Sequence, residues 1–241
     1  MKTETTEGIE GRGQAATSEA LLHQTRVVCD HRGVLFLPDY RTLVVSDLHL
    51  EKGSSFARRG MFLPPYDTAA TLKRLCALVE EYAPRTVISL GDSFHDTDGP
   101  ARLIEPFRSQ LADLASGREW FWITGNHDPH PPGGLPGETF TELRIAGLIF
   151  RHEPQENAEP GEVAGHLHPC AKIVARGRGL RRRCFASDGA RMILPAFGSL
   201  TGSLNVLDRA YAKLFAWERF TAHMMGGTRM FAVPRTLLYP G

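Results

Sequence analysis

The sequence is short of the features that mark several protein classes. It has four cysteines among 241 residues and no C-x-x-C pair, which argues against a zinc ribbon and against a disulfide scaffold. Lys plus Arg number 28 and Asp plus Glu 27, so the formal net charge of +1 excludes a strongly basic coat for nucleic acid. No apolar run approaches the roughly 20 residues that cross a bilayer. We therefore expect a globular protein of the cytoplasm with no membrane contact.

The first twenty residues also lack the apolar stretch of a secretory signal. They are polar and include Glu4, Glu7 and Glu10. We predict a disordered leader over residues 1–24 and a single domain over residues 25–241, which is a usual length for one domain. The sequence does not define the oligomeric state.

Strand and helix patterns alternate in the first half of the chain. Apolar runs predict strands at residues 33–38, 42–46, 86–90 and 120–124, and helical spacing predicts helices over residues 67–82 and 101–115. Such alternation is typical of a largely parallel sheet. After Pro136, short strand patterns follow one another with little helix between them, which predicts a second, mostly antiparallel sheet packed on the first.

Histidine, with ten residues, is the component that stands out. Several histidines, together with Asp and Asn, directly follow predicted strands, where open α/β sheets carry their sites. Five strand ends share this feature: Asp47-Leu-His49, Gly91-Asp92, Gly125-Asn-His-Asp128, His152 and Gly165-His-Leu-His168. Imidazole and carboxylate groups without thiolate suit Mn, Fe or Zn. Seven candidate ligands exceed the needs of one tetrahedral ion, which favours two ions sharing a carboxylate, and His166 and His168 could face one ion or two.

These five segments, in this order, resemble the calcineurin-like metallophosphoesterases over about residues 41 to 197. The resemblance implies an α/β fold, a four-layer α-β-β-α sandwich with two mixed sheets. It also implies two divalent ions, for which we expect Mn²⁺, with Fe or Zn as alternatives. One ion would take Asp47, His49, Asp92 and His168; the other would take Asp92, Asn126, His152 and His166, with Asp92 bridging. The same resemblance makes His127 the general acid, oriented by Asp128.

Longer sequence segments indicate which members of this family the chain resembles most. Gly91-Asp-Ser-Phe-His95-Asp departs from the G-D-x-x-D-R form of protein phosphatases and is similar to the G-D-x-F-H form of SbcD-type DNA nucleases, in which this histidine lies beside the active site. Residues 46–53, 63–68, 90–96 and 151–154 resemble the bacterial ligase-associated DNA damage response phosphoesterases (PdeM). That resemblance implies a phosphodiesterase or endonuclease acting on a phosphodiester such as DNA in bacterial DNA repair. It also implies an ATP-dependent DNA ligase, a helicase and an exonuclease as partners.

Two basic segments are candidates for phosphate contacts. Arg58 and Arg59 follow the first ligand segment and could bind the scissile or an adjacent phosphate, or simply flank Gly60. Residues 176–183 hold five arginines in eight positions, which suits either a solvated hairpin tip or a clamp on backbone phosphates. No aromatic residues interleave them to stack on bases.

Other functions remain open at this point. A phosphomonoesterase acting on a nucleotide or phosphoprotein would use the same metal core. A catalytically dispensable scaffold in a DNA repair complex would be expected to lose the general acid, but His127 is present. A DNA-binding module that does not cut is disfavoured by the near-zero net charge. We therefore expect an enzyme.

Overall fold

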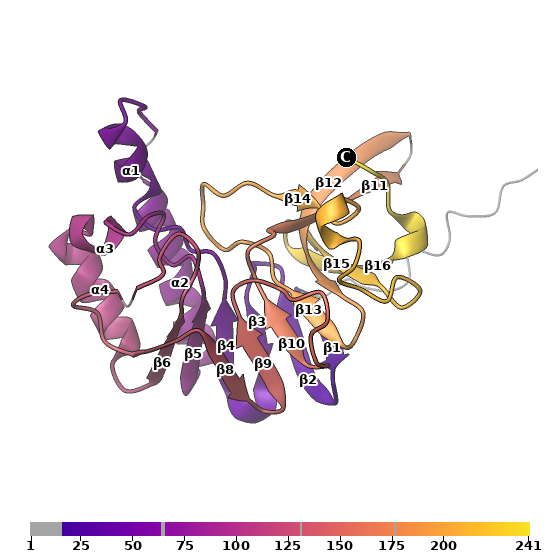
Figure 1. The fold of residues 1–241 in the computed structure, drawn as a ribbon, viewed down its shortest axis with the longest axis horizontal. Coiled ribbons are helices and arrows are strands. Elements are labelled where there is room, and N and C mark those ends of the chain that lie inside the picture. Colours follow the sequence, from indigo (N-terminus) through magenta and orange to yellow (C-terminus); the bar gives the residue numbers. More distant parts are fainter. Residues whose placement is uncertain (1–15, 64–65, 131, 176) are drawn as a thin grey trace, which may run out of the picture.

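The computed structural model describes residues 16–63, 66–130, 132–175 and 177–241. Two mixed sheets pack against each other, and most of the α-helices lie over the outer face of the first sheet, whereas the first helix projects beyond the end of that sheet (Figure 1). These helices are α1 (Lys52–Arg58), α2 (Asp67–Tyr82), α3 (Gly99–Arg102) and α4 (Glu105–Ala115). The predicted α/β fold class with two mixed sheets is confirmed.

The first sheet has the strand order β1-β2-β3-β4-β5-β6-β7. Its strands are β1 (Thr17–Leu22), β2 (Thr25–Asp30), β3 (Leu35–Leu37), β4 (Thr42–Val45), β5 (Thr86–Leu90), β6 (Glu119–Ile123) and β7 (Glu138–Phe140). The pairs from β4 to β7 are parallel and those from β1 to β4 are antiparallel. Because β4, β5 and β6 run in the same direction, their carboxyl ends meet at one edge of the sheet.

The second sheet has the order β14-β11-β12-β13-β10-β9-β8, with β15 pairing to β12 and β16 to β15. Its strands are β8 (Glu142–Ile145), β9 (Leu148–Arg151), β10 (Glu162–Ala164), β11 (Pro169–Ala175), β12 (Arg178–Ser187), β13 (Arg191–Ile193), β14 (Leu204–Asn205), β15 (Thr221–Gly226) and β16 (Arg229–Pro234). Most of its pairs are antiparallel, as predicted, but β10 pairs in parallel with β9 and β13, and β11 pairs in parallel with β14. The ends of β9 and β10 therefore lie at the same edge.

Three apolar clusters hold these layers together. Leu72 and Leu75 of α2 belong to the cluster under the helices, and Ile88 and Phe150 to the cluster between the sheets. The third cluster includes Tyr211, which lies in the 3₁₀ helix η2 (Arg209–Tyr211) against the outer face of the second sheet. The fourth layer is thus built from 3₁₀ turns and irregular chain in the part of the molecule that the structure describes.

The structure differs from the predicted elements in several places, and two of these differences have a clear physical reason. The helix expected over residues 101–115 is divided into α3 and α4, because Pro106 lies in the first turn of α4, where its missing N–H costs no helical hydrogen bond. The leader expected over residues 1–24 extends too far, since Thr17–Leu22 form β1, whose register is set by pairing with β2. Residues 1–15 lie outside the described residues.

The two sheets are joined by backbone hydrogen bonds just after β4. The Phe197 N–H donates to the Ser46 carbonyl at 2.7 Å, and the Gly198 N–H donates to the Asp47 carbonyl at 3.0 Å. Arg74 of α2 donates to the Phe197 carbonyl and stacks on the Phe197 ring at 4.1 Å. A loop that follows β13 is thereby fastened to the end of β4.

Two further observations bear on the sequence-based expectations. All four cysteines are free thiols, which agrees with the expected absence of a disulfide scaffold. Within the described ranges, no helix is both long enough and apolar enough to cross a membrane.

Candidate metal centre

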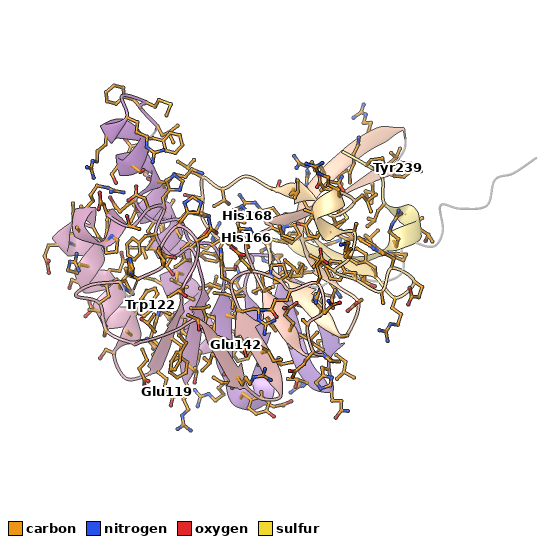
Figure 2. The ribbon with its side chains drawn as sticks, in the orientation of Figure 1. Glu119, Trp122, Glu142, His166, His168 and Tyr239 are labelled. Carbon is orange, nitrogen blue, oxygen red and sulfur yellow. The ribbon has the colours of Figure 1, made fainter. Side chains whose placement is uncertain are left out.

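The seven predicted metal ligands all follow strand ends that adjoin one another. Four come from the first sheet, after β4, β5 and β6: Asp47, His49, Asp92 and Asn126. Three come from the second sheet, after β9 and β10: His152, His166 and His168. In Figure 2, His166 and His168 lie between α1 and the β11–β12 hairpin, which project from the same side of the molecule (Figure 1).

Backbone pairing fixes the first two ligand segments against each other. The Asp47 N–H donates to the Gly91 carbonyl at 3.2 Å, and the His49 N–H donates to the Asp92 carbonyl at 2.9 Å. The pairing continues as Leu50 N–H to Ser93 O and His95 N–H to Leu50 O, both at 2.9 Å. These loops are therefore an extension of the sheet, which holds their side chains in defined positions.

Five of the seven predicted ligands adopt left-handed backbone conformations. The φ angles are 53° for Asp47, 42° for His49, 45° for Asp92, 67° for His166 and 47° for His168. Each such residue costs of the order of 1–3 kcal/mol and persists only where surrounding contacts over-determine it, as at functional sites. The backbone conformation at these residues is therefore energetically unfavourable by itself, but it orients the five side chains toward the site.

Two glycines make room for the ligands. A Cβ atom on Gly91 would lie 2.1 Å from Nδ1 of His152, and one on Gly125 would lie 2.2 Å from Oδ1 of Asp92. Both distances are far below contact distance. The glycine that precedes Asp92 and the glycine that precedes Asn126 are therefore required by the packing of neighbouring ligands.

The first ligand cluster contains Asp47, His49 and His168, whose donor atoms lie within 4.8 Å of one another. Nε2 of His168 is 3.1 Å from Oδ1 of Asp47 and 3.4 Å from Nε2 of His49. Nε2 of His49 also lies 3.8 Å from Oδ2 of Asp92.

The second cluster contains Asp92, His152 and His166 within the same distance limit. Oδ2 of Asp92 lies 3.4 Å from Nε2 of His152, so one carboxylate oxygen is close to both clusters. Oδ1 of Asn126 is 3.0 Å from Nε2 of His152 and 3.0 Å from Nδ1 of His166. The structure therefore brings all seven residues together in two groups that share Asp92.

The electrostatics of these groups suit divalent cations. Burial alone would raise the pKa of Asp92, but hydrogen bonding and charge from His152 outweigh it and lower this pKa to about 2. Burial lowers the pKa of His49 to about 3, which keeps its ring in the neutral form that binds metal. Burial also opposes the cationic form of His152, yet Asp92 and Asp47 raise its pKa to about 9. A mixed set of imidazole, carboxylate and amide donors fits Mn, Fe or Zn.

His127 and His95 lie beside the first cluster. The His127 N–H donates to Oδ1 of Asp92 at 2.9 Å, and Nδ1 of His127 donates to the His95 carbonyl at 2.8 Å. The two rings stack with their centroids 5.2 Å apart, and the His127 ring is 5.2 Å from that of His49. The hydrogen bond from Nδ1 leaves Nε2 of His127 available to a substrate.

Asp128 does not have the predicted position against His127. Its carboxylate accepts hydrogen bonds from the N–H groups of Phe94, at 3.0 Å, and Gly125, at 3.1 Å. Burial, with the nearby charge of Asp92, raises the Asp128 pKa to about 7. Asp128 fastens the 94–95 segment to the Gly125 turn, and the partner that orients the His127 ring is the His95 carbonyl.

Arg58 and Arg59, the two arginines predicted to contact phosphate, are exposed, whereas most of the predicted metal ligands are buried. Arg58 lies on α1, is 61% exposed, and forms an ion pair with Asp98 at 3.1 Å. Arg59 is exposed at the end of the same helix. The structure places neither guanidinium among the ligand side chains.

The arginine-rich segment is partly committed to the fold. Arg183 donates to the carbonyls of Ala196 and Thr201 at 3.0 and 2.9 Å, and Arg181 donates to the Ser203 carbonyl at 2.6 Å. Arg178 and Arg182 are exposed on β12, and Arg176 lies outside the described residues. Arg182 also donates to a carbonyl, that of Arg181, at 2.9 Å. Three of the five arginines therefore bind backbone carbonyls, which leaves fewer guanidinium groups for a phosphate clamp.

Some residues that shape the site carry no pattern that sequence reasoning could use. Ser46 donates to the Asp47 carboxylate, and the Leu90 carbonyl accepts from Nδ1 of His152 at 3.2 Å. The Glu51 N–H donates to Oγ1 of Thr68 at 2.9 Å, which fastens the start of α1 to α2. Glu51 and Thr68 lie in two of the family-like segments, so the only available signal was the resemblance itself.

Comparison with known proteins gives consistent results. The family profile described as calcineurin-like phosphoesterase matches residues 40–184. Among solved structures, the Pseudomonas putida nuclease MPE is 26% identical, with a TM-score of 0.69, covering 90% of this chain and 100% of that one. The phosphoesterase Yfce from E. coli is 13% identical, with a TM-score of 0.39, covering 68% of this chain and 83% of that one. At that score the second superposition supports no statement about function. No curated protein matches the sequence.

Proposed function

Because the chain belongs to the calcineurin-like phosphoesterase family and is a metal-dependent phosphoester hydrolase, we propose that it is a two-metal phosphodiesterase that cleaves DNA. The observation that carries this proposal is the position of Asp92, whose Oδ2 lies 3.8 Å from Nε2 of His49 and 3.4 Å from Nε2 of His152. A carboxylate between two ligand clusters suits a bridging ligand. When bound, two divalent cations supply Lewis acidity that neutralises phosphate oxygens and lowers the pKa of water.

We propose that the protein side chains bind the ions, donate a proton and contact the substrate. We propose Asp47, His49, Asp92 and His168 as ligands of one ion, and Asp92, Asn126, His152 and His166 as ligands of the other. His127 is proposed to donate a proton from Nε2 to the departing oxygen, since its Nδ1–H is already used by the His95 carbonyl. Arg58 and Arg59 on α1 are proposed to contact phosphates farther along the strand, away from the ions.

DNA is the proposed substrate because the Pseudomonas putida protein, a structural neighbour with a TM-score of 0.69, is a nuclease, and because the sequence segments resemble DNA repair phosphoesterases. A role in bacterial DNA repair in the cytoplasm, and contacts with an ATP-dependent ligase, a helicase and an exonuclease, are proposed from the resemblance of the sequence segments. We propose Mn²⁺ as the metal, with Fe and Zn as alternatives, because imidazole and carboxylate donors are compatible with all three.

Activity assays test the reaction class first. With Mn²⁺, the protein should hydrolyse bis-p-nitrophenyl phosphate and cut a fluorescent DNA oligonucleotide, and Asp92→Asn should lower both rates at least about a thousandfold, since the metals contribute several kcal/mol. Asn keeps a side chain that tolerates the left-handed backbone at position 92. Activity that survives EDTA would contradict the proposal. A much faster reaction with p-nitrophenyl phosphate than with the diester would favour a phosphomonoesterase.

The general acid can be tested by changing the leaving group. His127→Asn should slow DNA cleavage about 10²- to 10⁴-fold, because the departing sugar oxygen needs a proton. Hydrolysis of bis-p-nitrophenyl phosphate should fall much less, because p-nitrophenolate leaves without one. Equal losses on both substrates would assign His127 to binding and not to proton transfer.

A further inference from the structure

A histidine that binds a metal through one ring nitrogen needs a hydrogen-bond acceptor for the N–H of its other ring nitrogen. His152 and His49 have different kinds of partner at this second nitrogen. A histidine that binds a metal through one nitrogen carries a proton on the other, and proteins almost always give that N–H an acceptor. In His152, Nε2 faces Asp92 and Nδ1 donates to the Leu90 carbonyl at 3.2 Å. In His49, Nε2 faces Asp92 and His168, so Nδ1 would carry the proton when Nε2 binds a metal ion.

The partner of that second nitrogen is another imidazole. Nδ1 of His49 lies 3.5 Å from Nδ1 of His95, with the ring centroids 5.5 Å apart in an edge-on arrangement. We infer that His95 is a positioning residue: its Nδ1 accepts the Nδ1–H of His49 and fixes the ring of that metal ligand, while its backbone carbonyl fixes the ring of His127. This inference rests on the proposed two-metal site, since His49 is a ligand only there.

The fold holds His95 firmly enough for this task. Its N–H donates to the Leu50 carbonyl at 2.9 Å, as the last bond of the pairing that also includes His49. The next residue, Asp96, accepts two hydrogen bonds from Arg102, at 2.8 and 2.9 Å. Arg102 in turn donates to Oγ of Ser54 on α1 at 3.0 Å. The position of His95 is therefore set by bonds that involve neither metal nor substrate.

This arrangement determines the tautomer of His95. If its Nδ1 accepts a hydrogen bond from His49, the proton of neutral His95 is on Nε2. His95 then acts in the site as an acceptor toward the ligand and a donor at Nε2, and not as a cation that binds phosphate. The sequence resemblance placed this histidine beside the active site, and the geometry gives it a defined partner there.

Metal-binding measurements on two nearly isosteric variants test the inference. In His95→Asn the amide oxygen can occupy the position of Nδ1 and accept the same hydrogen bond, whereas His95→Leu has a similar shape and no acceptor. Binding of Mn²⁺ to the metal-free proteins would be followed by the electron paramagnetic resonance signal of free Mn²⁺. We expect His95→Leu to weaken one of the two ions about 10- to 100-fold, and His95→Asn to stay within about threefold of the wild type.

Three results would overturn the inference. These are unchanged binding in His95→Leu, equal weakening in both variants, and loss of a third bound ion, which would mean that His49, His95 and His127 themselves hold metal. His23→Asn on the exposed β1–β2 turn, at the opposite edge of the first sheet, controls for the loss of an imidazole. A wild-type protein that binds two ions but cleaves no phosphodiester would contradict the proposed function alone.

A measurement on the unaltered protein covers the case in which a variant fails to fold. In the Zn²⁺-loaded wild type, which is diamagnetic, long-range ¹H–¹⁵N correlation spectra report the protonated nitrogen of each histidine ring. We expect the proton of His49 on Nδ1 and that of His95 on Nε2. A proton on Nδ1 of His95 would remove the acceptor and exclude the proposed role.

Discussion

Two groups of buried carboxylates in this protein have opposite kinds of partner. At the site, Asp47 and Asp92 are 0% and 2% exposed, and within the described residues the basic side chains closest to their oxygens are histidines. In the second sheet, Glu162 is also 0% exposed, but it lies between two arginines. Its oxygens are 2.8 Å from Nη1 of Arg151 and 2.5 Å from Nε of Arg191.

The type of basic partner, arginine or histidine, indicates the role of each buried carboxylate. A buried carboxylate needs a compensating positive charge, since its desolvation is expensive. Arginine is a permanent cation, so Glu162 is neutralised by the protein itself. Imidazole can lose its proton and present a lone pair, so the partners of Asp47 and Asp92 can give way to metal ions. Equal burial therefore serves stability in one group and metal binding in the other.

The largest effect on folding is expected from the arginine-paired group. Glu162→Gln leaves Arg151 and Arg191 without their shared anion and should lower the free energy of unfolding by about 3–5 kcal/mol, measured by urea denaturation. The exposed Glu159, which pairs with Arg144 at 3.2 Å, offers a matched control, and Glu159→Gln should cost less than about 1 kcal/mol. Mn²⁺ affinity of folded Glu162→Gln should equal that of the wild type. A loss of Mn²⁺ affinity in this variant would break the distinction between the groups.

The next effect concerns stabilisation by the metal. Mn²⁺ at a hundred times its dissociation constant should stabilise the wild type by about 2.7 kcal/mol for each ion bound, because only the folded state presents the assembled ligands. Asp92→Asn should lose most of this increment, and Glu162→Gln should keep it. Differential scanning calorimetry with and without Mn²⁺ measures both. Equal metal stabilisation of the wild type and Asp92→Asn would show that Asp92 is not a ligand.

Asp30, another buried carboxylate that is paired with an arginine, sharpens the comparison through pH. Burial would raise the pKa of Asp30, but hydrogen bonds from Arg32 and Tyr82 outweigh it, and the pKa is lowered. Its stabilising effect is therefore complete above the ordinary pKa of about 3.9 and is lost as the pH falls through the lowered value. Asp30→Asn should cost about 1–3 kcal/mol at pH 7, and the difference from the wild type should vanish in strong acid. A constant difference from pH 7 to pH 2 would contradict this account.

The sequence predicted the elements that have a strong local pattern. The helix over residues 67–82 and the strand over residues 86–90 match α2 and β5 at both ends, because apolar spacing and Pro84 define them locally. The seven ligands were expected to converge because they follow predicted strand ends, where open α/β sheets carry their sites, and because the family resemblance implies a shared metal centre. Their grouping around Asp92 agrees with that expectation, although the individual roles stay predictions.

What the sequence could not provide depends on contacts between distant segments. Asp128 was expected to orient His127, but its carboxylate accepts hydrogen bonds from the backbone N–H groups of Phe94 and Gly125. Nearly every residue has a backbone N–H, so the sequence does not show which of these groups will bind a carboxylate. Arg183 belongs to a segment for which the sequence suited either a solvated hairpin tip or a phosphate clamp, yet it binds carbonyls of a loop after β13 that no local pattern brings near it. β1 is an edge strand that exists through its pairing with β2.

The loop that fastens the two sheets together also constrains the order of assembly. Phe197 and Gly198 bind the carbonyls of Ser46 and Asp47, and the His166 N–H donates to the Asp47 carboxylate across 119 positions of sequence. Contacts of such separation form slowly, after local helices and hairpins. On the ribosome, Asp47 and Asp92 are made long before the chain that covers them. The first sheet carries four of the seven proposed ligands, and the other three follow strands of the second sheet. We therefore expect complete metal binding to be a late step, after the second half of the protein has been synthesised and has docked.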